Sequence, residues 1–155
     1  MINHDIKIRG AVEEDLITLR SFEQGIIQAE RPFTPVLKDD PVHYYDLSQM
    51  LADANTEIVV LELNGEPVAC GYARIEQSQN FYSHKRHAYL GMMYVAPMHR
   101  GKGLIEMILT YLKESVKKKG IQELRLDVFS LNHSAIKAYE KAGFGKHMIQ
   151  MRMHI

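Results

Sequence analysis

The chain opens with a strand-like pattern followed by a helix-like one. Residues 6–9 alternate apolar and polar side chains, which predicts a half-buried strand. Acidic residues come next, and apolar positions between Leu16 and Ile27 then recur near the helical period, so we expect a first helix there. Two prolines interrupt this pattern, and the segment from Arg31 to Asp40 is predicted to be a loop.

The next part of the chain predicts a second helix and a β-hairpin. The helix is expected to begin at the Asp40-Pro41 pair, because proline is favoured in a first helical turn, and to end before Asn55. Two β-rich runs follow, Glu57–Leu63 and Pro67–Ile75. The Asn64-Gly65 dipeptide between them favours a tight turn, so the two runs are predicted to pair as antiparallel strands.

The second half of the chain is predicted to alternate strands and helices. We expect, in order, a polar loop over 77–86, a central strand over 88–95, a helix from Lys102 to Gly120, a strand over 124–129, a short helix over 132–142 and a final alternating strand over 146–155. Strands and helices therefore interleave over the whole length. With 155 residues and no linker or repeat, the chain is expected to form a single α/β domain over residues 1–155.

Composition narrows the possible classes of protein. Lysine plus arginine and aspartate plus glutamate number 19 each, so the overall charge does not favour nucleic acid as a partner. Cys70 is the single cysteine and cannot form an intramolecular disulfide, and the N-terminus does not resemble a secretory signal. No apolar run approaches the roughly 20 residues needed to cross a bilayer. We therefore expect a cytoplasmic protein without a membrane partner.

A candidate phosphate site lies where the central strand runs into the third predicted helix. The segment Val95-Ala96-Pro97-Met98-His99-Arg100-Gly101-Lys102-Gly103-Leu104 leaves the amides of the first helical turn without intrahelical partners. Gly101 and Gly103 would let a ligand approach the backbone, and the helix dipole favours an anion there. Two such glycines also occur in ordinary turns, but the basic neighbours Arg100 and Lys102 favour a pyrophosphate.

Two ordered motifs resemble those of one enzyme family. The run Arg100-Gly101-Lys102-Gly103-Leu104 after Val95-Ala96-Pro97 is similar to the acyl-CoA-binding motif Gln/Arg-x-x-Gly-x-Gly/Ala of the GNAT N-acetyltransferase superfamily. About thirty residues later, Leu131-Asn132-His133-Ser134-Ala135-Ile136-Lys137-Ala138-Tyr139-Glu140-Lys141-Ala142-Gly143-Phe144 resembles its second CoA-contacting motif. Ile105 departs from the pattern, because the family prefers a small residue there; its side chain would either narrow the approach or pack in the core.

The resemblance implies a fold, a reaction and a set of binding residues. It implies a GNAT-like α/β (α+β) domain whose mixed central sheet has about six to seven strands flanked by about four helices. It also implies transfer of an acyl group, typically acetyl from acetyl-CoA, to a primary amine by direct attack in a ternary complex, without a metal. The residues expected to bind CoA are Met93, Tyr94, Val95, Arg100, Gly101, Lys102, Gly103, Leu104, Ile105, Asn132 and Tyr139.

Tyr139 is the best candidate for a catalytic side chain. Tyrosine titrates near pH 10, so it can protonate a departing thiolate, and this is the role that the resemblance gives to the position. Without the motif, Tyr139 would be interpreted as a core aromatic whose hydroxyl is satisfied by backbone. Asn132 precedes it by seven residues, about two helical turns, and either caps the helix, contacts CoA or does both.

The general base is less well marked. Glu76 at the end of the third strand is the carboxylate candidate, with His87 and Tyr89 at the start of the next strand as alternatives; a solvated surface role fits each of them as well. His84 and His87 have a possible metal-ligand spacing but no acidic or cysteine partner nearby in the sequence, which disfavours a metal site. Cys70 is interpreted as a small core residue rather than a nucleophile.

The acceptor amine is not specified by the sequence. The two early helices and the loops over 31–40 and 77–86 are expected to border its site. Candidates to contact it are Arg31, Phe33, His43, Tyr44 and Tyr45, although packing and surface roles fit these side chains equally well. Small molecules (a polyamine, an aminoglycoside, an amino acid) and protein or peptide amines all remain possible acceptors, and a homodimer is possible. The alternative to an enzyme is a CoA-binding sensor or interaction module that has lost turnover.

Overall fold

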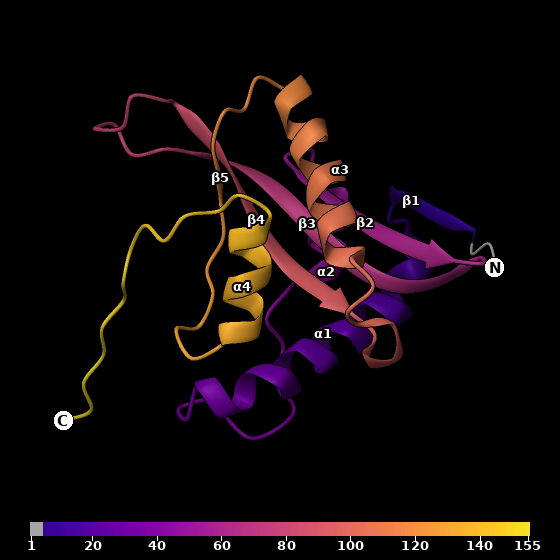
Figure 1. The fold of residues 1–155 in the computed structure, drawn as a ribbon, viewed down its shortest axis with the longest axis horizontal. Coiled ribbons are helices and arrows are strands. Elements are labelled where there is room, and N and C mark those ends of the chain that lie inside the picture. The colour runs from indigo at the N-terminus through magenta and orange to yellow at the C-terminus, as the bar shows by residue number, and fades with distance from the viewer. Residues whose placement is uncertain (1–4) are drawn as a thin grey trace.

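A computed structural model of the chain describes residues 5–155 and shows one mixed sheet with helices on both of its faces (Figure 1). The strands lie in the order β1-β2-β3-β4-β5. The first four pair antiparallel, and β5 lies parallel to β4. The strands are β1 (Ile6–Gly10), β2 (Thr56–Leu63), β3 (Glu66–Gln77), β4 (Arg86–Val95) and β5 (Leu124–Arg125). This arrangement confirms the predicted α/β class.

The helices divide the core into two clusters, one on each face of the sheet. The helices are α1 (Leu16–Glu30), α2 (Leu47–Ala52), α3 (Leu104–Lys118) and α4 (His133–Lys141), with 3-10 turns η1 (Glu13–Asp15), η2 (Arg31–Phe33) and η3 (Pro97–His99). Buried residues of α1 and α2 pack with one cluster, and those of α3 pack with the other, against which α4 also lies. The sheet is therefore covered on both faces.

The predicted hairpin is confirmed. Leu63 and Glu66 face each other at the end of the β2–β3 ladder. The two residues between them, Asn64 and Gly65, have φ values of 53° and 85°. Positive φ at both central positions is what a tight hairpin turn needs, and these two residue types adopt it most readily.

The second helix begins later than predicted, at Leu47 rather than at Asp40-Pro41. Asp46 caps it, because the Asp46 carboxylate accepts a hydrogen bond from the Gln49 amide at 3.1 Å. The amides of the two residues before this cap are already committed to a carboxylate on α1. A proline favours a first turn but does not create one where tertiary hydrogen bonds take the backbone amides that follow it.

The C-terminal part of the predicted sheet is shorter than expected. The strand predicted over 124–129 pairs with β4 only at its first two residues, and residues 146–155 form no strand, so the described chain has five strands rather than six or seven. β4 and β5 part after the Tyr89–Arg125 pair. The C-terminal segment runs away from the other strands (Figure 1), and its apolar side chains from Met148 to Ile155 are more than 80% exposed. Its alternation is typical of a strand, but no sheet edge lies beside it.

A buried ion pair joins β1 to the start of α1. Both oxygens of Asp15 accept hydrogen bonds from the guanidinium of Arg9, at 2.7 and 2.9 Å, and Arg9 also pairs with Glu62 of β2 at 2.7 Å. Asp15 accepts the Val12 amide at 2.8 Å as well, and only 6% of the residue is exposed. The hydrogen bonds from Arg9 hold the pKa of Asp15 below its usual value.

This ion pair predicts a pH-dependent contribution to stability. Because the pKa of Asp15 is lowered by folding, its contribution is complete above the unfolded pKa, near 4, and is lost as the pH falls through the lower folded value. We expect Asp15→Asn to lower the free energy of unfolding by roughly 2 kcal/mol at pH 7. Chemical denaturation from pH 7 to pH 2 should show this difference shrinking below pH 4. The exposed Asp39→Asn is the control, and an equal effect of the two variants would contradict the assignment.

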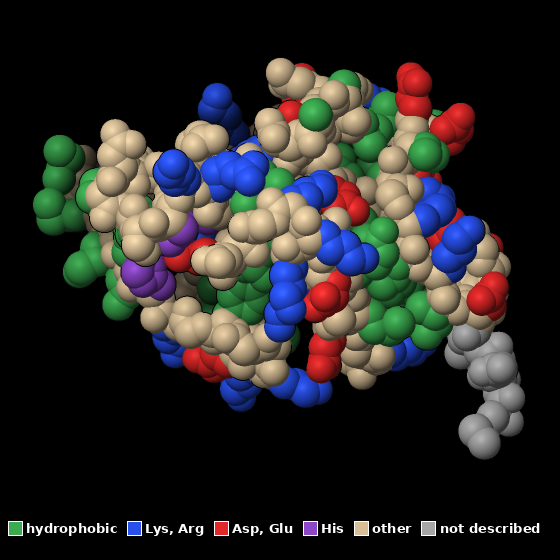
Figure 2. Space-filling model, turned by 90° about the horizontal axis from the view of Figure 1, so that it is seen from above, with side chains coloured by type: hydrophobic (Ala, Val, Ile, Leu, Met, Phe, Trp, Pro, Cys, Tyr) green, Lys and Arg blue, Asp and Glu red, His purple; other side chains and the backbone are tan. Residues whose placement is uncertain are grey.

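The surface carries a mixture of charges. On the face seen in Figure 2, Lys and Arg side chains are interspersed with Asp, Glu and apolar side chains rather than gathered into a patch of one sign. This distribution fits the balanced composition. Within residues 5–155, no helix combines the length and the apolar character that crossing a bilayer demands.

Candidate active site

A bulge in β4 marks the place where the sheet opens. Tyr72 faces Gly91 and Cys70 faces Tyr94, so two residues of β4 lie opposite one residue of β3, and Met92 takes a φ of 52°. The Met92 carbonyl accepts a hydrogen bond from Cys70 Sγ at 3.4 Å. The carbonyl of the bulged residue is thus held by a side chain of β3. Bulges of this kind re-aim a strand next to active sites.

Cys70 is a core residue, as predicted. It is 0% exposed, and its burial raises the pKa of the thiol. A protonated, buried thiol is a poor nucleophile but a suitable weak donor to the carbonyl at the bulge.

The turn after β4 presents unpaired amides. Gly101 and Gly103 have φ values of 75° and 76°, a left-handed conformation that favours glycine, and a Cβ at either position would meet open space. In the part of the chain that the structure describes, no acceptor takes a hydrogen bond from the amides of residues 101–106. The helix itself begins at Leu104, two residues after the predicted start. The turn therefore offers free donors at a helix N-terminus, which suits an anion such as a diphosphate.

The side chains of this turn divide between packing and exposure. Arg100 Nε donates to the Val95 carbonyl at 3.1 Å, and its guanidinium lies over the Tyr94 ring at 6.0 Å. Lys102 is exposed, with Nζ 3.3 Å from His99 Nδ1. Leu104 is buried, and Ile105 packs against the core. The Ile105 side chain therefore packs in the core rather than narrowing the approach to the turn, and the turn stays open.

Asn132 and Tyr139 lie on α4, next to the opening between β4 and β5. The Asn132 side chain caps α4 by accepting a hydrogen bond from the Ala135 amide at 3.2 Å. The Tyr139 ring packs edge-on against Phe144, with the ring centroids 6.0 Å apart. Within residues 5–155, the Tyr139 hydroxyl has no hydrogen-bond partner, which distinguishes it from an ordinary core tyrosine.

The environment of Tyr139 raises the pKa of its hydroxyl to about 12, first through burial and then through the negative charge of Glu30. The hydroxyl is therefore protonated at neutral pH, as a proton donor must be. It is also a weaker acid than a free tyrosine, and a neighbouring carboxylate is part of the reason.

Five further tyrosines pack on the α1 side of the sheet, and we call four of them the tyrosine cluster: Tyr44, Tyr45, Tyr72 and Tyr89. Neighbouring rings meet edge-on, with centroids 6.0 Å apart for Tyr44 and Tyr45 and 5.8 Å apart for Tyr45 and Tyr72. The Tyr89 hydroxyl donates to Asp127 at 3.2 Å, just beyond β5. The cluster thus extends from the segment before α2 to the point where β4 and β5 separate.

Glu76 lies at the far end of the sheet from the bulge. Its carboxylate pairs with Arg74 at 2.6 Å and with His87 at 3.4 Å, and His87 Nδ1 lies 2.9 Å from Ser78 Oγ. His87, the partner of Glu76 in the ladder, precedes Met92 by five residues, about 16 Å along a strand. The structure therefore does not bring Glu76 or His87 together with Tyr139, and their role in proton transfer stays a prediction.

The two histidines considered as metal ligands have separate partners. His84 pairs with Glu123 at 3.2 Å, whereas His87 pairs with Glu76. Among residues 5–155, no group of three potential metal-ligating side chains comes together.

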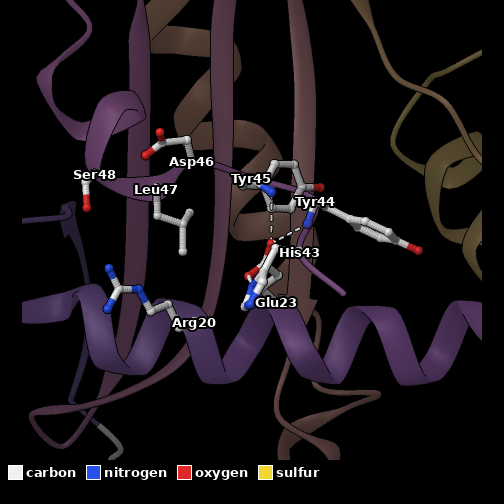
Figure 3. Close-up of a pocket in the computed structure, with 8 residues that line it drawn as sticks. All are labelled: Arg20, Glu23, His43, Tyr44, Tyr45, Asp46, Leu47 and Ser48. Atoms are coloured by element: carbon white, nitrogen blue, oxygen red, sulfur yellow. Dashed lines mark hydrogen bonds and ion pairs between the residues drawn. The ribbon is translucent and has the colours of Figure 1, made fainter. Parts of the chain in front are cut away.

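The residues proposed to contact an acceptor fall in two places. Arg31 forms an ion pair with Asp40 at 2.6 Å, and Phe33 stacks on Phe129 with a centroid distance of 6.3 Å, so the end of α1 meets the segment that precedes α4. His43 lies at an open groove of about 670 Å³, which is lined by Arg20, Glu23, His43, Tyr44, Tyr45, Asp46, Leu47 and Ser48 (Figure 3). In Figure 3 the Tyr44 side chain points away from this groove.

Glu23 forms the floor of that groove and fixes the segment above it. The Glu23 carboxylate, 1% exposed, accepts the amides of Tyr44 and Tyr45 at 2.6 and 2.9 Å, and its other oxygen lies 3.2 Å from His43 Nδ1 (Figure 3). A buried carboxylate satisfied by backbone amides holds a loop rather than a ligand. Sequence reasoning missed Glu23, although this acid interrupts the predicted apolar stripe of the first helix.

Comparison with known proteins places the chain in a family. The profile of the Acetyltransferase (GNAT) family matches residues 24–144. Over 56 residues, 36% of either chain, the sequence is 38% identical to YdgE, an uncharacterized N-acetyltransferase of Bacillus subtilis (strain 168). A predicted acetyltransferase from Clostridium acetobutylicum, solved with acetyl-CoA, superposes with a TM-score of 0.76 at 20% identity, covering 97% of this chain and 96% of that one.

An aminoglycoside acetyltransferase from an uncultured soil metagenomic sample, solved with trehalose, superposes with a TM-score of 0.70 at 20% identity, again over 97% of this chain and 96% of the other. These two structures show the shared fold. The family profile extends from the middle of α1 to Phe144, three residues past the end of α4, and includes the bulge, the free amides and Tyr139. The chain therefore belongs to the GNAT acetyltransferase family.

Proposed function

We propose that the protein transfers an acyl group, in the first instance acetyl from acetyl-CoA, to the primary amine of a small molecule by direct attack in a ternary complex. One observation carries the proposal: within residues 5–155, the amides of residues 101–106 and the hydroxyl of Tyr139 are donors without an acceptor. The amides suit the diphosphate of CoA, and the hydroxyl suits the departing thiolate. Family membership supports the same reaction.

The residues of this chain fit the thioester substrate. The space around Gly101 and Gly103 is open, so the backbone can be approached, and the exposed Lys102 adds positive charge. Beyond the bulge, β4 is left without a parallel partner, so its backbone around Met93 can pair with an extended chain. An amide on this strand would polarise the thioester carbonyl.

Release of free thiol from acetyl-CoA, measured with a panel of amines, tests the reaction. The panel contains aminoglycosides, polyamines, amino acids and a lysine peptide, since a relative of the same fold is an aminoglycoside acetyltransferase. Amine-dependent thiol release supports the proposal. Tight CoA binding without release of thiol for any amine would instead favour the alternative, a CoA-binding sensor or interaction module that has lost turnover.

The free amides of residues 101–106 also predict how a substitution in this turn changes the affinity for CoA. Gly103→Ala forces a side chain into a left-handed conformation, which costs about 1 kcal/mol and disturbs the start of α3. We expect CoA affinity, measured by isothermal titration calorimetry, to fall by about 10-fold. Gly65→Ala is the matched control, because Gly65 also has a positive φ and open space but lies in the β2–β3 turn. Equal CoA affinities of the two variants would mean that CoA does not bind at this turn.

A further inference from the structure

Asp127 is an exposed carboxylate just past the last pair between β4 and β5. It follows Arg125, the last residue of β5 that pairs with β4, by two positions. Side chains alternate along a strand, and Leu124 and Leu126 pack on the α3 side, so Asp127 points to the α1 side. The Tyr89 hydroxyl, which belongs to the tyrosine cluster on that side, donates to Asp127 Oδ2 at 3.2 Å. A hydrogen bond and the strand register thus place this carboxylate on the α1 face.

Gly91 of β4 lies between this carboxylate and a second tyrosine. Tyr72 faces Gly91 from β3, whereas Asp127 follows β5, on the other side of β4. A Cβ on Gly91 would lie 2.5 Å from the Tyr72 hydroxyl oxygen, so the Tyr72 ring extends over β4 at this point. The next residue along β4 is the bulged Met92. The Tyr72 hydroxyl and the Asp127 carboxylate therefore meet on one face, directly before the bulge.

The Tyr72 hydroxyl is unpaired but is not sealed in the core. Only 3% of the residue is exposed, and within residues 5–155 its hydroxyl makes no hydrogen bond. Among the same residues, every fully buried side-chain oxygen has a hydrogen-bond partner. The exposed part of Tyr72 therefore includes its hydroxyl, which is free to contact a ligand above Gly91.

Asp127 has no cation to balance its charge. Within residues 5–155, no lysine, arginine or histidine forms an ion pair with it. Arg74 and Arg125, the partners of Tyr89 in the two ladders, each pair with a glutamate two positions away along the chain. The Arg74 guanidinium lies 5.9 and 6.0 Å from the ring centroids of Tyr72 and Tyr89, so these rings already accept one cation. The carboxylate and the rings together favour a second one.

We propose that Asp127 binds the ammonium group of the acceptor amine, with the rings of Tyr72 and Tyr89 beside its alkyl chain. The inference rests on the proposed acyltransferase function and assigns its substrate class, an alkylamine that is cationic at neutral pH, together with the residue that selects it. A carboxylate provides the charged hydrogen bond that an ammonium group needs, and tyrosine faces attract alkylammonium groups. An anionic acceptor would be repelled.

The position of this carboxylate suits the proposed reaction. Met93, whose backbone would pair with the extended arm of the thioester, follows Gly91 by two residues. An ammonium group held at Asp127 lies on the α1 face of the sheet, whereas Tyr139 packs with the cluster on the α3 face. The amine and the proton donor would thus reach the thioester from different faces of the sheet.

Asp127→Asn tests the assignment, because asparagine keeps an oxygen for the Tyr89 hydroxyl but loses the charge. Asp127→Glu keeps the charge, and Glu114→Gln removes one charge from the exposed side of α3 as the matched control. For the amine of the panel with the highest kcat/KM at pH 7, we expect Asp127→Asn to lower kcat/KM by about 10- to 100-fold, mainly through KM. Asp127→Glu should stay within a few-fold of the wild type, and Glu114→Gln should equal it.

A neutral nucleophile gives a readout that separates charge recognition from a structural role. Hydroxylamine is uncharged at neutral pH, so its acetylation should proceed at nearly the same rate in Asp127→Asn and in the wild type. Equal losses with hydroxylamine and with the amine of the panel would mean that Asp127 acts on the structure of the site. That result, or an unchanged kcat/KM for the amine in Asp127→Asn, would overturn the inference.

A binding measurement separates the inference from the proposed function. Calorimetry of the CoA-saturated protein with each amine of the panel should detect binding in the wild type and in Glu114→Gln, with at least about 10-fold weaker binding in Asp127→Asn. Equal binding in all three proteins, or no binding of any amine to the wild type, contradicts the role of Asp127. Amine binding that depends on Asp127 without any thiol release contradicts only the acyltransferase function.

Discussion

Tyr139→Phe is expected to lower kcat by about 10²- to 10⁴-fold, the range for loss of a positioned general acid. The variant removes one oxygen from a ring that packs against Phe144 and the core, and that oxygen makes no hydrogen bond within residues 5–155. Folding should therefore be unaffected, and the CoA affinity should be nearly unchanged. Steady-state kinetics with acetyl-CoA and the best amine of the panel, together with calorimetry of CoA binding, measure both quantities.

Tyr111→Phe is the matched control for this variant. Tyr111 lies on α3, is 37% exposed and makes no ring contact or side-chain hydrogen bond within residues 5–155. Removing its hydroxyl should leave kcat at the wild-type value. If Tyr139→Phe also retains full activity with several acceptors, the thiolate takes its proton from water or from another group, and the assignment of Tyr139 as the acid is wrong.

The raised pKa of Tyr139 also predicts how activity depends on pH. Because burial and Glu30 raise this pKa to about 12, the hydroxyl stays protonated throughout the usual assay range. A loss of activity between pH 8 and pH 10 would therefore have to come from another group. This separation lets the acidic limb of the profile report on the base alone.

Local patterns in the sequence were sufficient for much of the fold. The hairpin at Asn64-Gly65 and the start of α4 at Asn132 depend on residues a few positions apart, and the structure has both where they were predicted. The prediction fails where a residue distant in the sequence determines the local structure. Residues 41–46 form no helix, and Glu23, about twenty positions earlier, accepts the amides of Tyr44 and Tyr45. The alternation over 146–155 could not show whether another strand lies beside it.

The candidate site could be predicted in part for the same reason. The glycines and the unpaired amides after β4 follow from one continuous segment, so sequence alone located them. The bulge at Met92 contacts Cys70, which lies on another strand. Glu23 carries no local motif, and its role comes from the amides of Tyr44 and Tyr45 that folding brings to it. The acceptor side of the site therefore depends on contacts between residues far apart in the sequence, which local patterns do not predict.

Glu23→Ala is expected to have the largest effect on stability, because Glu23 connects α1 to the segment that places Tyr44 and Tyr45. Removing its carboxylate leaves two backbone amides without an acceptor, at about 1–3 kcal/mol each, and opens a cavity. We expect the free energy of unfolding to fall by roughly 4 kcal/mol in urea denaturation. Glu23→Gln is the matched variant, because both amides donate to a single oxygen, which glutamine retains.

The same pair of variants separates the acceptor side of the site from the CoA side. In Glu23→Ala, the backbone of Tyr44 and Tyr45 loses its anchor, so the Tyr45 ring is no longer held against Tyr72. The amides of residues 101–106 do not depend on Glu23. At a temperature where the variant is still folded, we expect acyl transfer to fall by more than 10-fold while CoA affinity stays within a few-fold of the wild type. A parallel loss of acyl transfer and of CoA affinity would mean that the acceptor side and the CoA side of the site form one cooperative unit.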